Sequence, residues 1–218
     1  MPITLDSSLP ESLYPLAWLM GTWRGEGALH RPSDDAGDRR IEQELTCTAR
    51  EDDTMSWTSL VHLVDTPAPI PPTSSFAKED APAPADPGTG QRSLLLRETG
   101  LWTVGEPLPG QDLERARQAK PGDPEGVVSY GLSAVLGSEG VEHEWAGEVR
   151  GPRIQLARQG SGPGSPIADT RMFGYVGGRL MWLWERAPEQ ATANTGEEAA
   201  DWPGAGLVPY LSLELDRV

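Results

Sequence analysis

The chain has 218 residues with 33 acidic and 18 basic side chains, so its formal net charge at pH 7 is −15. This charge would repel phosphate backbones, and no segment approaches the roughly 20 apolar residues of a membrane-spanning helix, so neither nucleic acid nor a membrane is an expected partner. The single cysteine, Cys47, excludes an intramolecular disulfide. Together with an N-terminus that lacks a basic signal-peptide region, it favours a cytoplasmic protein.

The first predicted element is a short helical lid over residues 9–20, where Leu13, Leu16, Ala17 and Met20 share one face at helical spacing. From Gly21 onward the pattern indicates an all-β domain. Ten segments have strand character: residues 22–30, 39–49, 54–65, 92–104, 126–136, 141–149, 153–159, 168–176, 179–186 and 208–217.

Two kinds of segment interrupt the strands. Gly177 and Gly178 separate the eighth from the ninth, and a Gly-Gly pair is typical of a type I′ hairpin turn. Residues 66–91, 105–125 and 187–206 are polar or rich in Pro, Ala and Gly, and only the second contains a helical signal, at 113–120. We interpret these three as partly disordered insertions within a single domain spanning residues 1–218.

The most specific local pattern lies in the first strand, where Gly21, Trp23, Gly25 and Gly27 occupy alternate positions. Alternate residues of a strand point to one face, so this face carries one indole and three absent side chains. Glycine inside a strand often marks a sharp bend or the close approach of another backbone or a ligand. The pattern predicts a strand that curls tightly.

This run resembles the nitrobindin family, whose signature reads Gly-x-Trp-x-Gly-x-Gly. Glu98-Thr99-Gly100-Leu101-Trp102 and Pro209-Tyr210-Leu211-Ser212 are similar to two further strands of that family. The resemblance implies a ten-stranded antiparallel β-barrel like those of fatty-acid-binding proteins and lipocalins. It also implies a ferric haem b at the barrel mouth and the isomerisation of peroxynitrite to nitrate.

At the position of the family's axial haem histidine, this chain has Tyr210, and no histidine follows His143. Tyrosine ligates ferric haem in catalase, but with an ordinary pKa near 10 it needs an activating arginine or a strong pull from the metal. The haem-side stretch of the family motif is also altered: only Pro32 is identical, and Ser33 replaces a threonine. We therefore expect no haem in the family manner.

Other ligating side chains are scattered. His30, His62 and His143 lie on separate predicted strands without metal-ligand spacing, so we interpret them as histidines of solvated strand faces, with His30 closest to the expected pocket. Cys47 is interpreted as a small buried apolar side chain. We expect no metal site, and no catalytic set of residues is visible by spacing, although such sets are assembled in space.

Three functions remain open. The first is a nitrobindin-like barrel without family-type haem binding, which holds a small apolar ligand or has another role. The second is a haem-dependent peroxynitrite isomerase that uses Tyr210 or another ligand. The third is a carrier like the fatty-acid-binding proteins. The absent histidine favours the first, which makes a catalytic role unexpected; the oligomeric state stays open.

Overall fold

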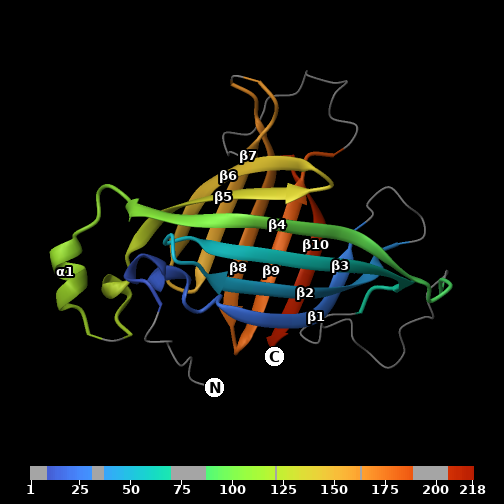
Figure 1. Ribbon diagram of the computed structural model, residues 1–218, viewed down its shortest axis with the longest axis horizontal. Coiled ribbons are helices and arrows are strands. Elements are labelled where there is room, and N and C mark those ends of the chain that lie inside the picture. The colour runs from blue at the N-terminus through green and yellow to red at the C-terminus, as the bar shows by residue number, and fades with distance from the viewer. Residues whose placement is uncertain (1–8, 31–36, 70–86, 121, 163, 189–205) are drawn as a thin grey trace.

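The computed structural model of the protein describes residues 9–30, 37–69, 87–120, 122–162, 164–188 and 206–218. Ten antiparallel strands close into one barrel, in which each strand pairs with its sequence neighbours and β1 pairs with β10 (Figure 1). The strands are β1 (Gly21–Leu29), β2 (Arg39–Ala49), β3 (Met55–Pro67), β4 (Arg92–Pro107), β5 (Ser129–Ser138), β6 (Val141–Arg150), β7 (Arg153–Gln159), β8 (Ile167–Val176), β9 (Arg179–Arg186) and β10 (Val208–Arg217).

The predicted all-β fold and its ten strands are confirmed. The boundaries agree closely, and the largest differences are that β4 continues to Pro107 and that β5 starts at Ser129. Gly177 and Gly178 both have positive φ, 61° and 91°, as the predicted type I′ turn requires. The expected helical signal at 113–120 is the short helix α1 (Leu113–Gln118), followed by the 3₁₀ turn η2 (Pro124–Gly126).

Of the three predicted insertions, 105–125 therefore contains the end of β4 and two short helical elements. In both helical elements the residue before the first turn, Asp112 or Asp123, accepts a hydrogen bond from a backbone N–H and caps the helix. Residues 70–86 and 189–205, which make up most of the other two insertions, lie outside the described residues.

The N-terminal lid is a 3₁₀ helix, η1 (Glu11–Leu16), that packs against β4 and β6 at one end of the barrel. Leu13 and Leu16 are fully buried, since residues three apart eclipse each other on a 3₁₀ helix. The Trp23 indole N–H donates to the Leu19 carbonyl at 2.8 Å, and Arg217 donates to Trp18 at 2.6 Å. These bonds attach the lid to β1 and β10. We call this end of the barrel the lid end and the opposite one the distal end.

The two glycines in the middle of β1 permit the barrel to close. A Cβ atom on Gly25 would lie 2.1 Å from the Glu214 carbonyl oxygen, and one on Gly27 would lie 1.9 Å from that of Ser212. The backbone of β10 thus occupies the space where two side chains would stand. The close approach of another backbone, which glycines inside a strand often mark, is here made by the last strand.

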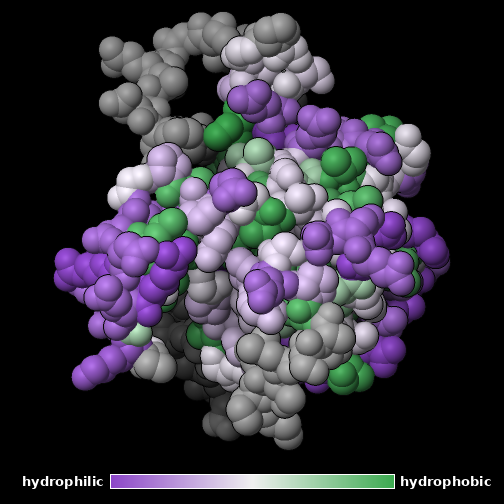
Figure 2. Space-filling view, turned by 60° about the vertical axis from the view of Figure 1, so that its left-hand side comes forward, coloured by the Kyte–Doolittle hydropathy of each residue, from purple (hydrophilic) through white to green (hydrophobic). Residues whose placement is uncertain are grey.

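The inner face of the barrel is filled by its own side chains. A continuous apolar core includes five fully or nearly fully buried tryptophans: Trp23, Trp57, Trp102, Trp145 and Trp182. Trp57 stacks on Trp102 with ring centroids 5.1 Å apart, and Phe173 stacks on Trp182 at 5.5 Å. On the face shown in Figure 2, polar residues predominate and apolar residues form small groups. No helix in the described part of the chain is long and apolar enough to cross a membrane.

Candidate functional site

The interior of the barrel contains a buried ion pair between β4 and β8. Arg171 donates to both carboxylate oxygens of Glu98, at 2.7 and 2.8 Å, and both side chains are at most 6% exposed. The Trp57 indole N–H donates to the same carboxylate at 3.0 Å. This two-pronged geometry is the strong form of an arginine–carboxylate contact and compensates both charges inside the core.

Two tryptophans enclose the guanidinium of this ion pair. The Arg171 Cζ atom lies 4.0 Å from the centre of the Trp184 ring and 4.4 Å from that of Trp145. Both distances are those of cation–π contacts, which are strongest where water is excluded. Among the described residues, the Arg171 Nε–H has no acceptor. A layer of four side chains therefore fills the barrel below its distal end: Glu98, Trp145, Arg171 and Trp184.

A second polar group lies closer to the distal end. Asp169 is buried and accepts from the Trp184 indole at 3.1 Å and from Arg158, and its carboxylate lies 3.3 Å from Arg186. Arg186 in turn lies over the ring of Tyr210, at 4.6 Å from its centre. The Asp169 carboxylate thus connects β7, β8 and β9, and Arg186 extends the group to β10.

Tyr210 sits at an irregularity in β10, because the pairing with β9 shifts between Pro209 and Leu211. Leu211, Leu213 and Leu215 face the interior, which would direct a regularly placed Tyr210 outward. Instead the half-buried ring packs edge-on against Trp184 with centroids 5.1 Å apart. A β-bulge redirects the side chains of the bulged strand in this way. The alternation of apolar and polar residues along this strand does not by itself determine the direction of the Tyr210 side chain.

The three histidines lie on the outside of the barrel or just beyond the end of a strand. His143 is exposed and His62 half-buried on the outer surface, where desolvation and then Arg92 lower the pKa of His62. His30, just after β1, has both ring nitrogens in hydrogen bonds, Nδ1 with Asp38 at 2.7 Å and Nε2 with Ser212 at 2.8 Å. No group of three or more His, Cys, Asp or Glu side chains in the described ranges is arranged to hold a metal.

The two remaining candidates are Cys47 and Ser33. Cys47 is buried, as the interpretation of a small apolar side chain requires, and burial raises the pKa of its thiol far above the ordinary value. Ser33 lies outside the described residues. Sequence reasoning missed Glu98 as one half of an ion pair, although it quoted this residue, and missed Arg171, Asp169 and the Ser212–His30–Asp38 contacts. These partners are distant in sequence, and only the barrel brings them together.

Comparison with known proteins decides the family. The model of the THAP4-like, heme-binding beta-barrel domain matches residues 12–200. The chain belongs to this family. A ferric nitrobindin-like protein of Beutenbergia cavernae is 31% identical over 86% of this chain and 92% of its own length. The resemblance to nitrobindins is thereby confirmed.

Two further proteins match over nearly the full length of both chains. A peroxynitrite isomerase of Arthrobacter sp. (strain FB24) is 26% identical over 100% of both chains. The crystal structure of Rv2717c from M. tuberculosis superposes with a TM-score of 0.51 at 18% identity, covering 97% of this chain and 99% of that one. This structural likeness supports the barrel fold.

Proposed function

We propose that this nitrobindin-family chain does not hold haem in the family manner and that the distal end of its barrel binds a small apolar ligand instead. The observation that carries the proposal is the packing of Tyr210, the residue at the expected axial position. Its ring packs edge-on against Trp184 and is covered by the Arg186 guanidinium. Arg171, the partner of Glu98, lies over the Trp184 ring.

The chemistry of this region supports the absence of family-type haem. An axial ligand must present a free donor atom to the iron. The imidazole of His30, the nearest histidine to Tyr210 along the barrel, has both nitrogens in hydrogen bonds. Beneath Tyr210, two indoles and a guanidinium occupy the interior that a large planar ring would need. The residues present therefore do not fit a haem.

A small apolar ligand fits the same region better. Tyr210 and Trp184 are both half-buried, so part of each ring faces outward at the distal end. Aromatic faces of this kind bind apolar groups and offer a polar tip for orientation. A ligand that rests on these rings would leave the ion pair below in place.

A second candidate function is a haem-dependent peroxynitrite isomerase with Tyr210 as ligand. The family description names haem, and relatives that match the whole chain are named peroxynitrite isomerases. The observation that favours it here is that the half-buried Tyr210 ring packs edge-on against Trp184, at the position where the family carries its axial ligand.

Titration of the purified protein with hemin, followed in the Soret region, separates the candidates. The proposal expects no saturable 1:1 spectral change, and native mass spectrometry should show a small apolar ligand retained by the protein and lost from Trp184→Ala. A tight 1:1 hemin complex would overturn it.

The second candidate is correct if that hemin complex disappears in Tyr210→Phe but persists in Tyr130→Phe. Tyr130 is a half-buried tyrosine elsewhere in the barrel. A co-purifying long-chain fatty acid would instead indicate a carrier.

A further inference from the structure

A serine, a histidine and an aspartate are hydrogen-bonded in series on the outer surface of the barrel. His30 Nδ1 lies 2.7 Å from the Asp38 carboxylate, and His30 Nε2 lies 2.8 Å from Ser212 Oγ. This is the connectivity of a serine-hydrolase triad, which is recognised by geometry and roles rather than by order in the sequence. The proposed ligand site at Tyr210 and the core ion pair use none of these three side chains.

The closure of the barrel builds this arrangement. Ser212 pairs with Ala28 across the seam between β1 and β10, and the His30 backbone N–H donates to the Tyr210 carbonyl at 2.9 Å. Ser212 is two residues beyond the irregularity at Tyr210, and Asp38 directly precedes β2. The imidazole therefore bridges the start of one strand and the early part of another.

The two side-chain contacts of His30 determine the tautomer of its neutral imidazole. Asp38 as a carboxylate accepts only, so Nδ1 of the neutral ring donates to it and Nε2 carries the lone pair. The Ser212 hydroxyl then donates to Nε2, as a nucleophile does to its general base. The side chains of His30 and Asp38 are 26% and 44% exposed, and Ser212 is half-buried, so all three can be approached from solvent.

An apolar surface adjoins the serine on the side away from His30. On the same outer face, Ser212 pairs with Leu183 of β9, and Leu183 pairs with Met172 of β8. Met172 and its neighbour Met181 are 37% and 43% exposed. Adjacent strands are about 4.8 Å apart, so this row starts next to Ser212 Oγ and extends for about the length of a short alkyl chain.

We propose that Ser212, His30 and Asp38 form a hydrolytic site for esters with a short apolar acyl group. Ser212 Oγ attacks the ester carbonyl carbon while its proton passes to His30 Nε2. The carbon–oxygen bond to the leaving alcohol breaks, and His30 returns the proton to that alcohol. Water then attacks the acyl-serine, gives a proton to Nε2, and releases the carboxylic acid as Ser212 Oγ regains its proton. The acyl chain lies along Leu183 and Met172.

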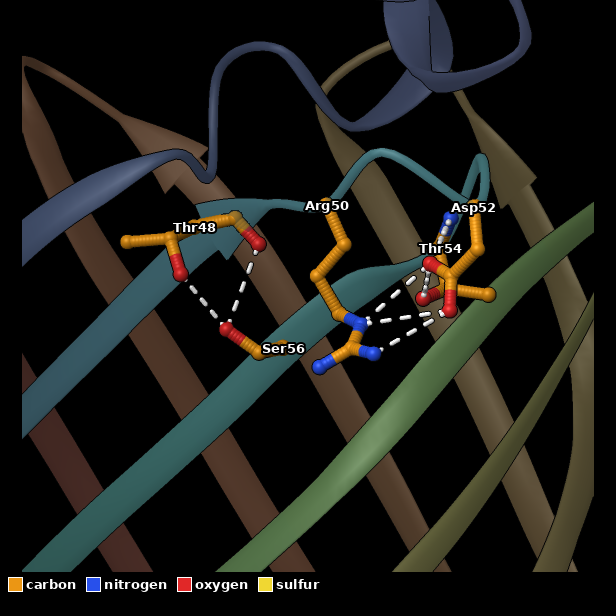
Figure 3. Close-up of polar contacts among 5 residues, drawn as sticks. All are labelled: Thr48, Arg50, Asp52, Thr54 and Ser56. Atoms are coloured by element: carbon orange, nitrogen blue, oxygen red, sulfur yellow. Dashed lines mark hydrogen bonds and ion pairs between the residues drawn. The ribbon is translucent and has the colours of Figure 1, made fainter.

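The test uses the full chain and p-nitrophenyl butyrate. The wild type is expected to release p-nitrophenolate above the buffer rate, Ser212→Ala to lower this release to background, and His30→Gln to reduce it by about 100-fold or more. Ser56→Ala is the matched control, because Ser56 is a surface serine hydrogen-bonded to Thr48 rather than to a histidine (Figure 3). Its activity should equal that of the wild type.

A second measurement excludes contaminating esterases and misfolded variants. A fluorophosphonate should form one adduct, in which a bond from Ser212 Oγ to phosphorus forms, fluoride leaves and the serine proton passes through His30 to solvent. Peptide mapping should locate this adduct at Ser212, and His30→Gln with an unchanged circular dichroism spectrum should slow its formation. The proposal is overturned if the wild type shows neither turnover nor adduct, or if turnover survives in Ser212→Ala.

Discussion

The buried pair of Glu98 and Arg171 shows what single residues contribute to this barrel. Taking two charges out of water costs several kcal/mol per ion, and only good geometry with further hydrogen bonds offsets that cost. Here the contact is two-pronged, Trp57 adds a hydrogen bond, and two indoles flank the cation. The pair should therefore tolerate loss of both partners better than loss of one.

We expect Glu98→Gln to lower the free energy of unfolding by about 3–5 kcal/mol, because it leaves the Arg171 cation uncompensated in the core. The control is Glu44→Gln, which breaks the exposed pair with Arg24 and should cost less than about 1 kcal/mol. Urea unfolding followed by tryptophan fluorescence measures both. Equal losses in the two variants would contradict the special role of the core pair.

The buried thiol of Cys47 makes the free energy of unfolding depend on pH in the alkaline range. Burial raises the pKa of its thiol above the ordinary 9.0, with Arg217 opposing weakly, so the folded state keeps a proton that the unfolded state releases above about pH 9. This contribution is complete below pH 9 and declines as pH rises, by about 1.4 kcal/mol per pH unit. Relative to Cys47→Ala, the wild type should lose about 2 kcal/mol between pH 8 and pH 10.5 in urea unfolding. A pH-independent difference would show that the thiol titrates normally in the fold.

At this scale, sequence reasoning identified some residues and missed their partners. The burial of Cys47, expected for a lone cysteine in a strand, is confirmed. Tyr210 was identified by its position, but its contact with Trp184 depends on an irregularity in pairing that no alternation reveals. His30 and Ser212 are 182 residues apart, so their contact is set by the closing seam.

At the scale of elements, the distinctive feature of β1 is the absence of side chains at its two central glycines. Gly25 and Gly27 leave room for the β10 backbone, while Trp23 on the same face anchors the strand to the lid through Leu19. The alternation of glycine and tryptophan predicted a tight curl because strand geometry sets the spacing of side chains. Which backbone fills the gap could not be predicted without the barrel's topology.

We predict that Gly27→Ala destabilises the protein by about 1–3 kcal/mol, since the new methyl group would overlap the Ser212 carbonyl and force β1 and β10 apart. Gly174→Ala is the matched control in another strand, because its Cβ atom would meet only Val176 Cγ2, at 3.8 Å. That variant should be neutral or slightly stabilising. Thermal unfolding by circular dichroism checks both, and a neutral Gly27→Ala would refute the close approach at the seam.

The order and limits of the strands were largely predictable from the sequence. Apolar and polar residues alternate along a strand, and turn residues mark where it ends. The extension of β4 beyond residue 104 was missed because Gly105 and Pro107 are poor strand residues. They are tolerated there since the pairing with β5 skips from Val104 to Pro107. Register irregularities of this kind are set by neighbouring strands and leave little trace in one sequence.

For the whole molecule, closure removes free strand edges, but the ten strand pairs are unequal. β2 and β3 pair through eleven positions, whereas β6 and β7 pair through only five, Ala146–Arg150 with Arg153–Ala157. In the described part of β6, residues 141–145 pair with β5 alone. A cleft lined by Trp145, Arg158 and other residues of both strands lies beside this gap. The barrel wall is therefore weakest between β6 and β7.

We expect the barrel to open there first, since local opening has the lowest free energy where few backbone bonds and apolar contacts must break. Hydrogen exchange followed by mass spectrometry at neutral pH should show peptides covering 141–150 and 153–159 exchanging before those covering 39–49 and 55–67. The seam between β1 and β10 is the alternative, because it joins the two ends of the chain and bends around glycines. Earlier exchange in 21–29 and 208–217 would place the weak point at the seam, next to His30 and Ser212. Trp145 belongs to the first of these regions and Tyr210 to the second, so the order of exchange tells which of the two walls of the barrel opens more readily.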